Sequence, residues 1–185
     1  MPLKNGHSSI YGTLTFSFMQ KRKIGQIRMS ENIKRDRAIE YFAAKMHCSQ
    51  SVLAAFSEEC GISEEQAFRL GSCFGSGMRK GEVCGACTGA LMVLGLLYGE
   101  THLGNKEERE LSNRINDLMM SRFKEENGSY ICNDLLGYDI STPEGRQKAR
   151  NEGLFTEFCP KMVASSVDIL EGIIEEMEHE RQIKG

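Results

Sequence analysis

The sequence predicts an all-α fold, a compact bundle of about six helices around a central apolar helix at residues 84–98. Three observations support this class. From residue 30 onward, apolar residues recur at the three- and four-residue intervals of a helix face. Capping residues and glycines separate these stretches. No alternation of strands with helices is visible, and 185 residues with 40% hydrophobic content suffice for one domain with its own core.

Two helices are expected before the first clear break. Ser30 can cap a first helix, whose apolar residues from Ile33 to Met46 follow one buried stripe. The second is expected over residues 48–59, with Gly61 as a typical C-terminal stop.

A capping box and a glycine-rich stretch come next. Ser63 and Gln66 form the pattern S-x-x-Q, which opens a third helix. Four glycines lie between residues 71 and 81, and this is too many for a stable helix. We therefore expect residues 73–81 to form a flexible or tightly turned loop.

The central helix is expected to begin near Cys84 and to end at Tyr98. Its apolar residues cover every face, which predicts that other helices surround it on all sides. Gly85 and Gly89 lie four residues apart on one face, so they allow a neighbouring backbone or a ligand to approach closely.

The rest of the chain continues the helical pattern. Each remaining segment carries a start or stop signal of its own. The segments are residues 106–126 with Gly128 after their end, the short turn 132–137, residues 143–151 with Thr142 as cap, and a last helix from Cys159.

Charge is distributed unevenly along the chain. Residues 1–28 hold five basic side chains and no acidic one, so residues 29–185 hold the remaining 18 bases against 26 acids, a balance of −8. We interpret residues 1–28 as an N-terminal extension, disordered or outside the fold, with translation starting at Met1 or Met29. Residues 29–185 form a single all-helical, cysteine-containing domain. Its acidic balance argues against a nucleic-acid partner, and no apolar stretch reaches the ~18–20 residues of a membrane span.

Seven cysteines are too few for a secreted disulfide scaffold, and their odd number prevents complete pairing. A reducing, cytoplasmic location fits best. Five of them lie at or close to predicted helix starts, where partial positive charge favours thiolate over thiol: Cys48, Cys84, Cys87, Cys132 and Cys159. Cys84 and Cys87 also form C-x-x-C, a spacing that lets two sulfurs pair or share a metal.

The other two cysteines carry no such signal. Cys60 and Cys73 are interpreted as small apolar residues of the fold. Hydrolase and nucleotide chemistry find no support either, because the chain lacks G-x-S-x-G and the G-K-S/T ending of a phosphate loop.

From Cys48 to Leu170 the chain resembles the redox-active protein family labelled by the cysteine pattern C-GCAxxG-C-C, whose core motif reads CGAxxG. Residues 84–89, Cys-Gly-Ala-Cys-Thr-Gly, match this motif. The family's first, third and fourth cysteines match Cys48, Cys132 and Cys159, and the segment Phe74-Gly75-Ser76-Gly77-Met78 resembles its F-G-G-G-M. The resemblance implies redox activity and supplies no substrate.

Two positions depart from the family pattern. Cys87 occupies a place that the motif leaves open, so the C-x-x-C is a feature of this chain rather than of the family. His47 replaces the asparagine expected before the first cysteine, either as a further ligand or proton donor or as a surface or cap residue.

Two hypotheses follow. In the first, Cys48, Cys84, Cys132 and Cys159 converge at one end of the bundle with Cys87 beside them. They then act in thiol–disulfide exchange, as in a thiol-dependent oxidoreductase, or they ligate zinc or an iron–sulfur cluster. In the second, the protein is a helical accessory module that binds an oxidoreductase or a transporter, and its cysteines are structural.

Overall fold

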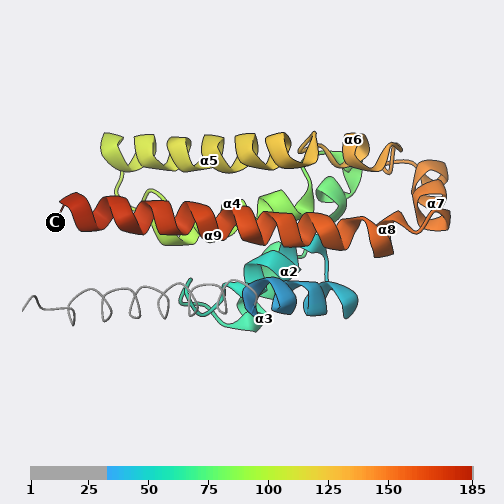
Figure 1. The fold of residues 1–185 in the computed structure, drawn as a ribbon, viewed down its shortest axis with the longest axis horizontal. Coiled ribbons are helices and arrows are strands. Elements are labelled where there is room, and N and C mark those ends of the chain that lie inside the picture. Colours follow the sequence, from blue (N-terminus) through green and yellow to red (C-terminus); the bar gives the residue numbers. More distant parts are fainter. Residues whose placement is uncertain (1–32, 185) are drawn as a thin grey trace, which may run out of the picture. The chain divides into compact units, whose positions relative to one another are not determined.

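The computed structural model describes residues 33–184, so the predicted extension at residues 1–28 and the Ser30 cap lie outside the described residues. Residues from Lys34 onward form one compact unit. Over the described range the chain is helical with no strand, which confirms the all-α class. Figure 1 shows α4, α5 and α9 running alongside one another, with the shorter helices gathered towards one end of them.

The helices follow the sequence signals closely in most places. The first is described over residues 33–43. The others are α2 (Cys48–Ala55), α3 (Glu64–Gly71), the turn η1 (Gly77–Gly81), α4 (Gly85–Tyr98), α5 (Lys106–Asn127), α6 (Cys132–Leu136), α7 (Pro143–Asn151), α8 (Leu154–Glu157) and α9 (Cys159–Lys184).

Two boundaries differ from the expectation. The second helix ends at Ala55 rather than near residue 59, because the chain tightens into three-residue bonds: the N–H of Phe56 donates to Leu53 O and that of Ser57 to Ala54 O. The short helix α8 was not predicted. It starts after Gly153, whose φ of 70° is readily adopted by glycine.

The central helix α4 packs against α2, α5 and α9. Three neighbours leave part of its surface open, and Leu96 is 45% exposed. The expectation that helices surround α4 on every side was therefore wrong for this face.

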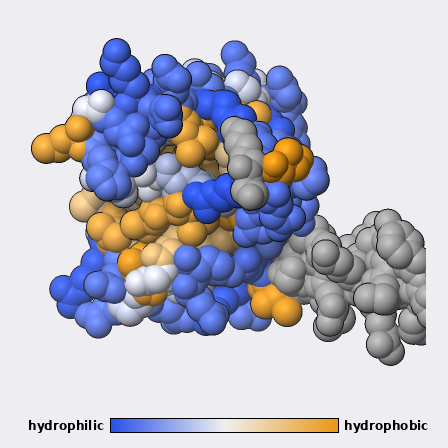
Figure 2. Space-filling model, turned by 90° about the vertical axis from the view of Figure 1, so that its left-hand side faces the viewer, coloured by the Kyte–Doolittle hydropathy of each residue, from blue (hydrophilic) through white to orange (hydrophobic). Residues whose placement is uncertain are grey.

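The end of the unit where α5 begins and α9 ends faces the viewer in Figure 2, and hydrophobic residues gather there between hydrophilic ones.

Glycines set the distance between α4 and α2. A Cβ on Gly89 would lie 2.8 Å from the carbonyl oxygen of Ser49, and one on Gly85 would lie 3.2 Å from the Cβ of Cys48. The separation at Gly89 is too short for any Cβ, so this approach requires glycine, whereas the separation at Gly85 is tight and would require its neighbours to move by a few tenths of an ångström. The predicted close approach at these glycines is confirmed: the backbone of α2 approaches Gly89, and the Cys48 side chain and the backbone of residues 74 and 75 approach Gly85.

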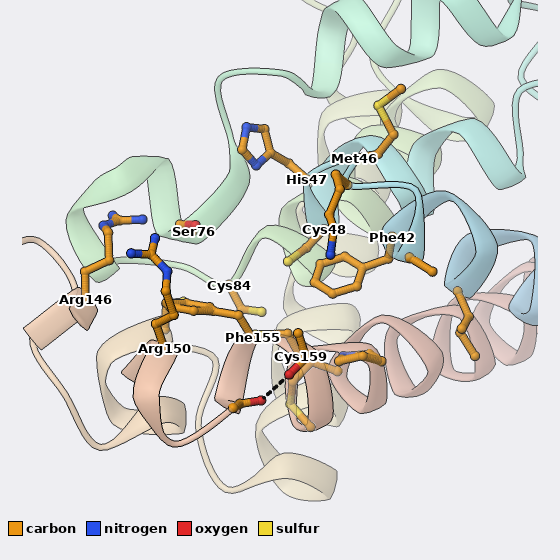
Figure 3. A pocket seen from close by; sticks show the side chains of 18 residues that line it. Phe42, Met46, His47, Cys48, Ser76, Cys84, Arg146, Arg150, Phe155 and Cys159 are labelled. Carbon is orange, nitrogen blue, oxygen red and sulfur yellow. Dashed lines mark hydrogen bonds between the residues drawn. The ribbon is translucent and has the colours of Figure 1, made fainter. Parts of the chain in front are cut away.

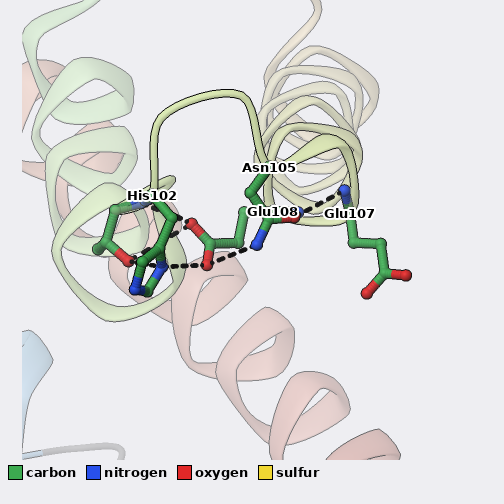
Figure 4. Close-up of polar contacts among 5 residues, drawn as sticks. His102, Asn105, Glu107 and Glu108 are labelled. Atoms are coloured by element: carbon green, nitrogen blue, oxygen red, sulfur yellow. Dashed lines mark hydrogen bonds and ion pairs between the residues drawn. The ribbon is translucent and has the colours of Figure 1, made fainter.

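The start of α5 is fixed by two side chains (Figure 4). Asn105 Oδ1 accepts hydrogen bonds from the N–H groups of Glu107 at 3.1 Å and Glu108 at 3.2 Å. The Glu108 carboxylate accepts from the N–H of Thr101 at 2.7 Å and of His102 at 3.0 Å. These two backbone bonds, followed by the His102 side chain, lower the pKa of Glu108 to about 2.

We expect Glu108→Ala to lower the free energy of unfolding at neutral pH, because the loop before α5 loses its acceptor. A carboxyl group with a depressed pKa contributes stability above its unfolded pKa, and this contribution disappears as the pH falls through the folded value. The difference in the free energy of unfolding between the variant and the natural chain should thus shrink as the pH falls from 4.5 to about 2. Ser63→Ala is the matched control, since it removes the N-cap of α3, whose hydroxyl does not titrate, at a loss of about 0.5–2 kcal/mol. Urea unfolding at several pH values measures both.

Within residues 33–184, no helix combines the length and the apolar composition that crossing a membrane requires.

Candidate functional site

Four helices begin around one cavity. Cys48, Cys132 and Cys159 are the first residues of α2, α6 and α9, and Cys84 directly precedes α4. All four line a cavity of about 880 Å³ (Figure 3). We call these residues the cavity cysteines. The expected convergence of sulfurs from distant parts of the chain is therefore present in the described structure.

A short backbone pairing places Cys84 beside Cys132. The N–H of Cys84 donates to Tyr130 O at 2.8 Å, and the N–H of Cys132 donates to Glu82 O at 2.7 Å. Between these bonds, Val83 and Ile131 form an isolated antiparallel bridge. The pairing holds the starts of α4 and α6 together, and sequence reasoning did not predict it.

A left-handed turn lies next to Cys48. Ser76, Met78 and Arg79 have φ values of 56°, 53° and 62°, and the glycine between them has a φ of 56°. Each such non-glycine residue costs about 1–2 kcal/mol. The predicted loop over residues 73–81 is thus a tight turn. It presents the backbone N–H of Ser76 to the sulfur of Cys48.

Cys48 and Cys159 are the most closely coupled thiols of the site. Although they lie 111 positions apart in the sequence, the Cys159 side chain is close enough to raise the pKa of the Cys48 thiol. Cys48 is half-buried, whereas the exposed fractions of Cys84, Cys132 and Cys159 are 4%, 6% and 8%. All seven cysteines are free thiols in this structure.

Burial reverses the expected effect of the helix starts on the thiols. The hydrogen bond to Cys159 and then burial raise the pKa of Cys48 well above its usual value, while the amides of Cys48 and Ser76 lower it less. Burial, followed by neighbouring Cys48, raises the pKa of Cys84 in the same way and that of Cys132 to about 12. The prediction that helix-end charge favours thiolate was wrong for these three groups, because desolvation and sulfur neighbours outweigh the amides.

The remaining cysteines lie away from the cavity. Cys87 is fully buried, with its sulfur 3.5 Å from the Sδ of Met120, and burial raises its pKa to about 12. It is not among the residues that line the cavity, although it lies only three positions after Cys84, so its part in the site stays a prediction. Cys60 is half-buried and packs against the core, whereas Cys73 is exposed.

Metal ligation by the cavity cysteines finds no preformed site in the part of the chain that the structure describes. There, no group of three or more histidine, cysteine, aspartate or glutamate side chains is arranged to hold a metal ion. Zinc or an iron–sulfur cluster therefore stays a prediction for these residues.

Sequence reasoning missed the cationic side of the cavity. Arg146 and Arg150 of α7 line it, together with Lys45 and His47 (Figure 3). The only signal near the arginines was the Thr142-Pro143 helix start, and charged residues on a polar helix usually face solvent. Their place at the cavity follows from how α7 packs.

A family model described as "putative redox-active protein (C_GCAxxG_C_C)" matches residues 46–173, which are 128 of the 185 residues. The chain belongs to this family. The match includes all four cavity cysteines, and it confirms the resemblance seen in the sequence. The description of the C_GCAxxG_C_C family gives Gly-Cys-Ala-x-x-Gly, whereas residues 84–89 of this chain read Cys-Gly-Ala-Cys-Thr-Gly. No curated protein and no solved structure matches the chain.

Proposed function

We propose that this protein is a thiol-dependent oxidoreductase in which Cys48 and Cys159 cycle between two thiols and a disulfide. The observation that carries the proposal is the convergence of the cavity cysteines, among which Cys159 is the neighbour that acts most strongly on Cys48. Oxidation removes two electrons and two protons from the pair and passes them to a disulfide acceptor, and a dithiol restores the reduced state. A reducing, cytoplasmic setting remains part of this proposal.

The surroundings of the pair suit reversible chemistry. Cys48 is half-buried, and the cavity gives a small molecule access to the sulfurs. Cys84 and Cys132 lie at the same cavity and interact with Cys48, and the proposal assigns them no part in the disulfide. The raised pKa values of Cys48, Cys84 and Cys132 keep these three thiols protonated at rest, which protects them from unselective oxidation.

The rate of exchange should rise steeply with pH. Because thiolate is the attacking species, a raised pKa leaves less of it at a given pH, and the rate grows about tenfold per pH unit until the pKa is reached. With neutral dithiodipyridine, we expect this rise to continue beyond pH ~9, whereas a small free thiol levels off near its pKa of about 8.5. A chain with Cys60→Ser and Cys73→Ser removes the thiols outside the cavity that lie nearest solvent. A plateau near pH ~8.5 in the rate at which Cys48, Cys84 and Cys132 react would contradict the raised pKa values of these three thiols.

Metal ligation is the second candidate, and the specific observation in its favour is that four cysteines at one cavity equal a full ligand set for zinc or an iron–sulfur cluster. Anaerobic purification followed by an absorption spectrum, metal analysis and a thiol count before and after reductant separates the two. A colourless, metal-free protein that gains two thiols on reduction supports exchange. Visible cluster absorption, or stoichiometric zinc, supports ligation instead.

The accessory-module hypothesis predicts a different outcome of the same experiment. If the cysteines were structural, the thiol count would not change on reduction and the spectrum would show no metal. Serine at Cys84 or Cys159 would then alter only stability and leave binding to an oxidoreductase or transporter intact.

A further inference from the structure

The arginines of this chain fall into two groups. Within residues 33–184 there are ten, and six pair with carboxylates: Arg35, Arg37, Arg69, Arg109, Arg114 and Arg122. Three of the other four are Arg79, Arg146 and Arg150, and the charges of Arg79 and Arg150 act on Arg146 as like charges. None of these three forms an ion pair with a carboxylate in the described part of the chain.

Two of the three unpaired arginines line the thiol cavity. Arg146 Nη2 donates to the carbonyl oxygen of Ile140 at 2.9 Å, and Arg150 Nη1 donates to Gln147 Oε1 at 3.2 Å. Figure 3 shows the two guanidinium groups close together on one side of the cavity. Each has five N–H donors, so each keeps donors for a ligand.

The charge at the cavity is opposite to that of the domain. Residues 29–185 carry a balance of −8, yet Lys45, Arg146 and Arg150 line the cavity and no aspartate or glutamate is among the described residues that do. Like charges held together without a counter-charge repel one another, and burial together with the charges of Arg79 and Arg150 lowers the pKa of Arg146. An anion would relieve this repulsion, and arginine binds carboxylate and phosphate groups in a bidentate manner.

The cavity also accepts an organic group. Its volume of about 880 Å³ lies within the ~300–1,000 Å³ of small-molecule sites. Phe42, Met46 and Phe155 add apolar surface to the lining. The thiols, the cations and the apolar side chains therefore meet at one place.

We propose that the cavity binds a small organic anion that contains a disulfide bond, with Arg146 and Arg150 binding its acidic groups while the cavity cysteines reduce its sulfur–sulfur bond. This inference rests on the proposed function and names its substrate class.

The reaction proceeds in two exchanges. One cavity thiol loses its proton to solvent, and its sulfur attacks a sulfur of the bound disulfide. A protein–substrate disulfide forms, the substrate bond breaks, and the released half takes up a proton. A second cavity thiol attacks the protein sulfur and releases the other half as a thiol. Two protein thiols are oxidised to a disulfide, and one substrate disulfide is reduced to two thiols.

The test compares disulfides of different charge on the full chain carrying Cys60→Ser and Cys73→Ser. The probes are dianionic dithiobis(nitrobenzoate), neutral dithiodipyridine and dicationic cystamine. Arg146→Gln/Arg150→Gln should lower the rate with the dianion by about tenfold, with the neutral rate within about twofold. The dianion-to-neutral ratio is the rate with the dianionic disulfide divided by the rate with the neutral one. Comparing this ratio between variants cancels the intrinsic reactivity of the two reagents. The ratio should also fall as ionic strength rises.

Two variants separate a local effect from net charge and from structure. Arg69→Gln/Arg181→Gln removes the same charge at residues that do not line the cavity, and its dianion-to-neutral ratio should stay at the natural level. Arg146→Lys/Arg150→Lys keeps the charge and should keep most of the preference. If the natural chain shows no preference for the dianion, or if the glutamine pair lowers both rates equally, the anion site is refuted.

A binding measurement keeps this test independent of thiol chemistry. A non-reducible aromatic dicarboxylate at saturating concentration should raise the Tm of the natural chain by about 2–4 °C and that of Arg146→Gln/Arg150→Gln by less than half as much. Equal shifts, or none in the natural chain, would overturn the anion site. A shift without any reaction of the cavity thiols would preserve the anion site and instead refute the proposed exchange.

Discussion

Cys48→Ser and Cys159→Ser should each abolish the reversible loss of two thiols on oxidation. Either change leaves the other cysteine of the proposed pair without the sulfur with which it forms the disulfide. We expect the gain of thiols on reduction, counted after mild oxidation of the chain with Cys60→Ser and Cys73→Ser, to fall from two to none in each variant. The reduction of a neutral disulfide should fall at least about 100-fold, because a mixed disulfide can no longer be resolved by the proper partner.

Cys87→Ser is the matched control for these variants. Its sulfur contacts Met120 away from the cavity, so the thiol gain should stay at two while the free energy of unfolding falls by about 1–3 kcal/mol for a hydroxyl placed in an apolar site. A thiol gain that survives in both Cys48→Ser and Cys159→Ser would assign the redox pair to other cysteines. If the gain of thiols on reduction disappears in Cys87→Ser, Cys87 takes part in the redox site.

Gly89→Ala should destabilise the whole protein. The added Cβ would lie 2.8 Å from Ser49 O and 3.0 Å from Ser49 Cα, and backbone atoms cannot move aside as a flexible side chain can. Forcing α4 and α2 apart costs about 1–3 kcal/mol, which exceeds the gain of up to ~1 kcal/mol from replacing a helical glycine. Because α2 carries Cys48 and α4 follows Cys84, the exchange rate should fall as well.

Gly95→Ala makes the same substitution on the same helix at a position that does not contact α2. No heavy atom lies within 4 Å of its added Cβ, so this variant should be more stable by about 0.5–1 kcal/mol. Urea unfolding of both variants gives the two free energies. Equal effects of the two substitutions would show that the α2–α4 approach does not depend on Gly89.

Local sequence signals predicted most of the helices. The candidate site cysteines were predicted because they lie at or close to the starts of these helices. Thr142 and Pro143 gave the start of α7, and the cysteine before Pro160 gave the start of α9, because caps and prolines act on their own neighbourhood. The family pattern then grouped four distant cysteines, and the cavity they line matches that grouping.

Other features depend on packing and could not be predicted from local signals. The bridge between Val83 and Ile131 joins segments that are 48 positions apart, and neither has a strand pattern of its own. The direction of the thiol pKa shifts depends on burial, which only the assembled fold determines. The amides at a helix start, taken alone, lower the pKa of a thiol, so the sequence predicted the opposite direction of the shift.

Disulfide mapping by mass spectrometry tests the central claim most directly. The reduced chain is treated with one equivalent of a mild oxidant, remaining thiols are alkylated, and linked peptides are identified. We predict a peptide pair joined through Cys48 and Cys159 that disappears on treatment with a dithiol. Recovery of both residues as alkylated thiols, with any disulfide confined to Cys60, Cys73 or Cys87, would contradict a redox centre at this cavity.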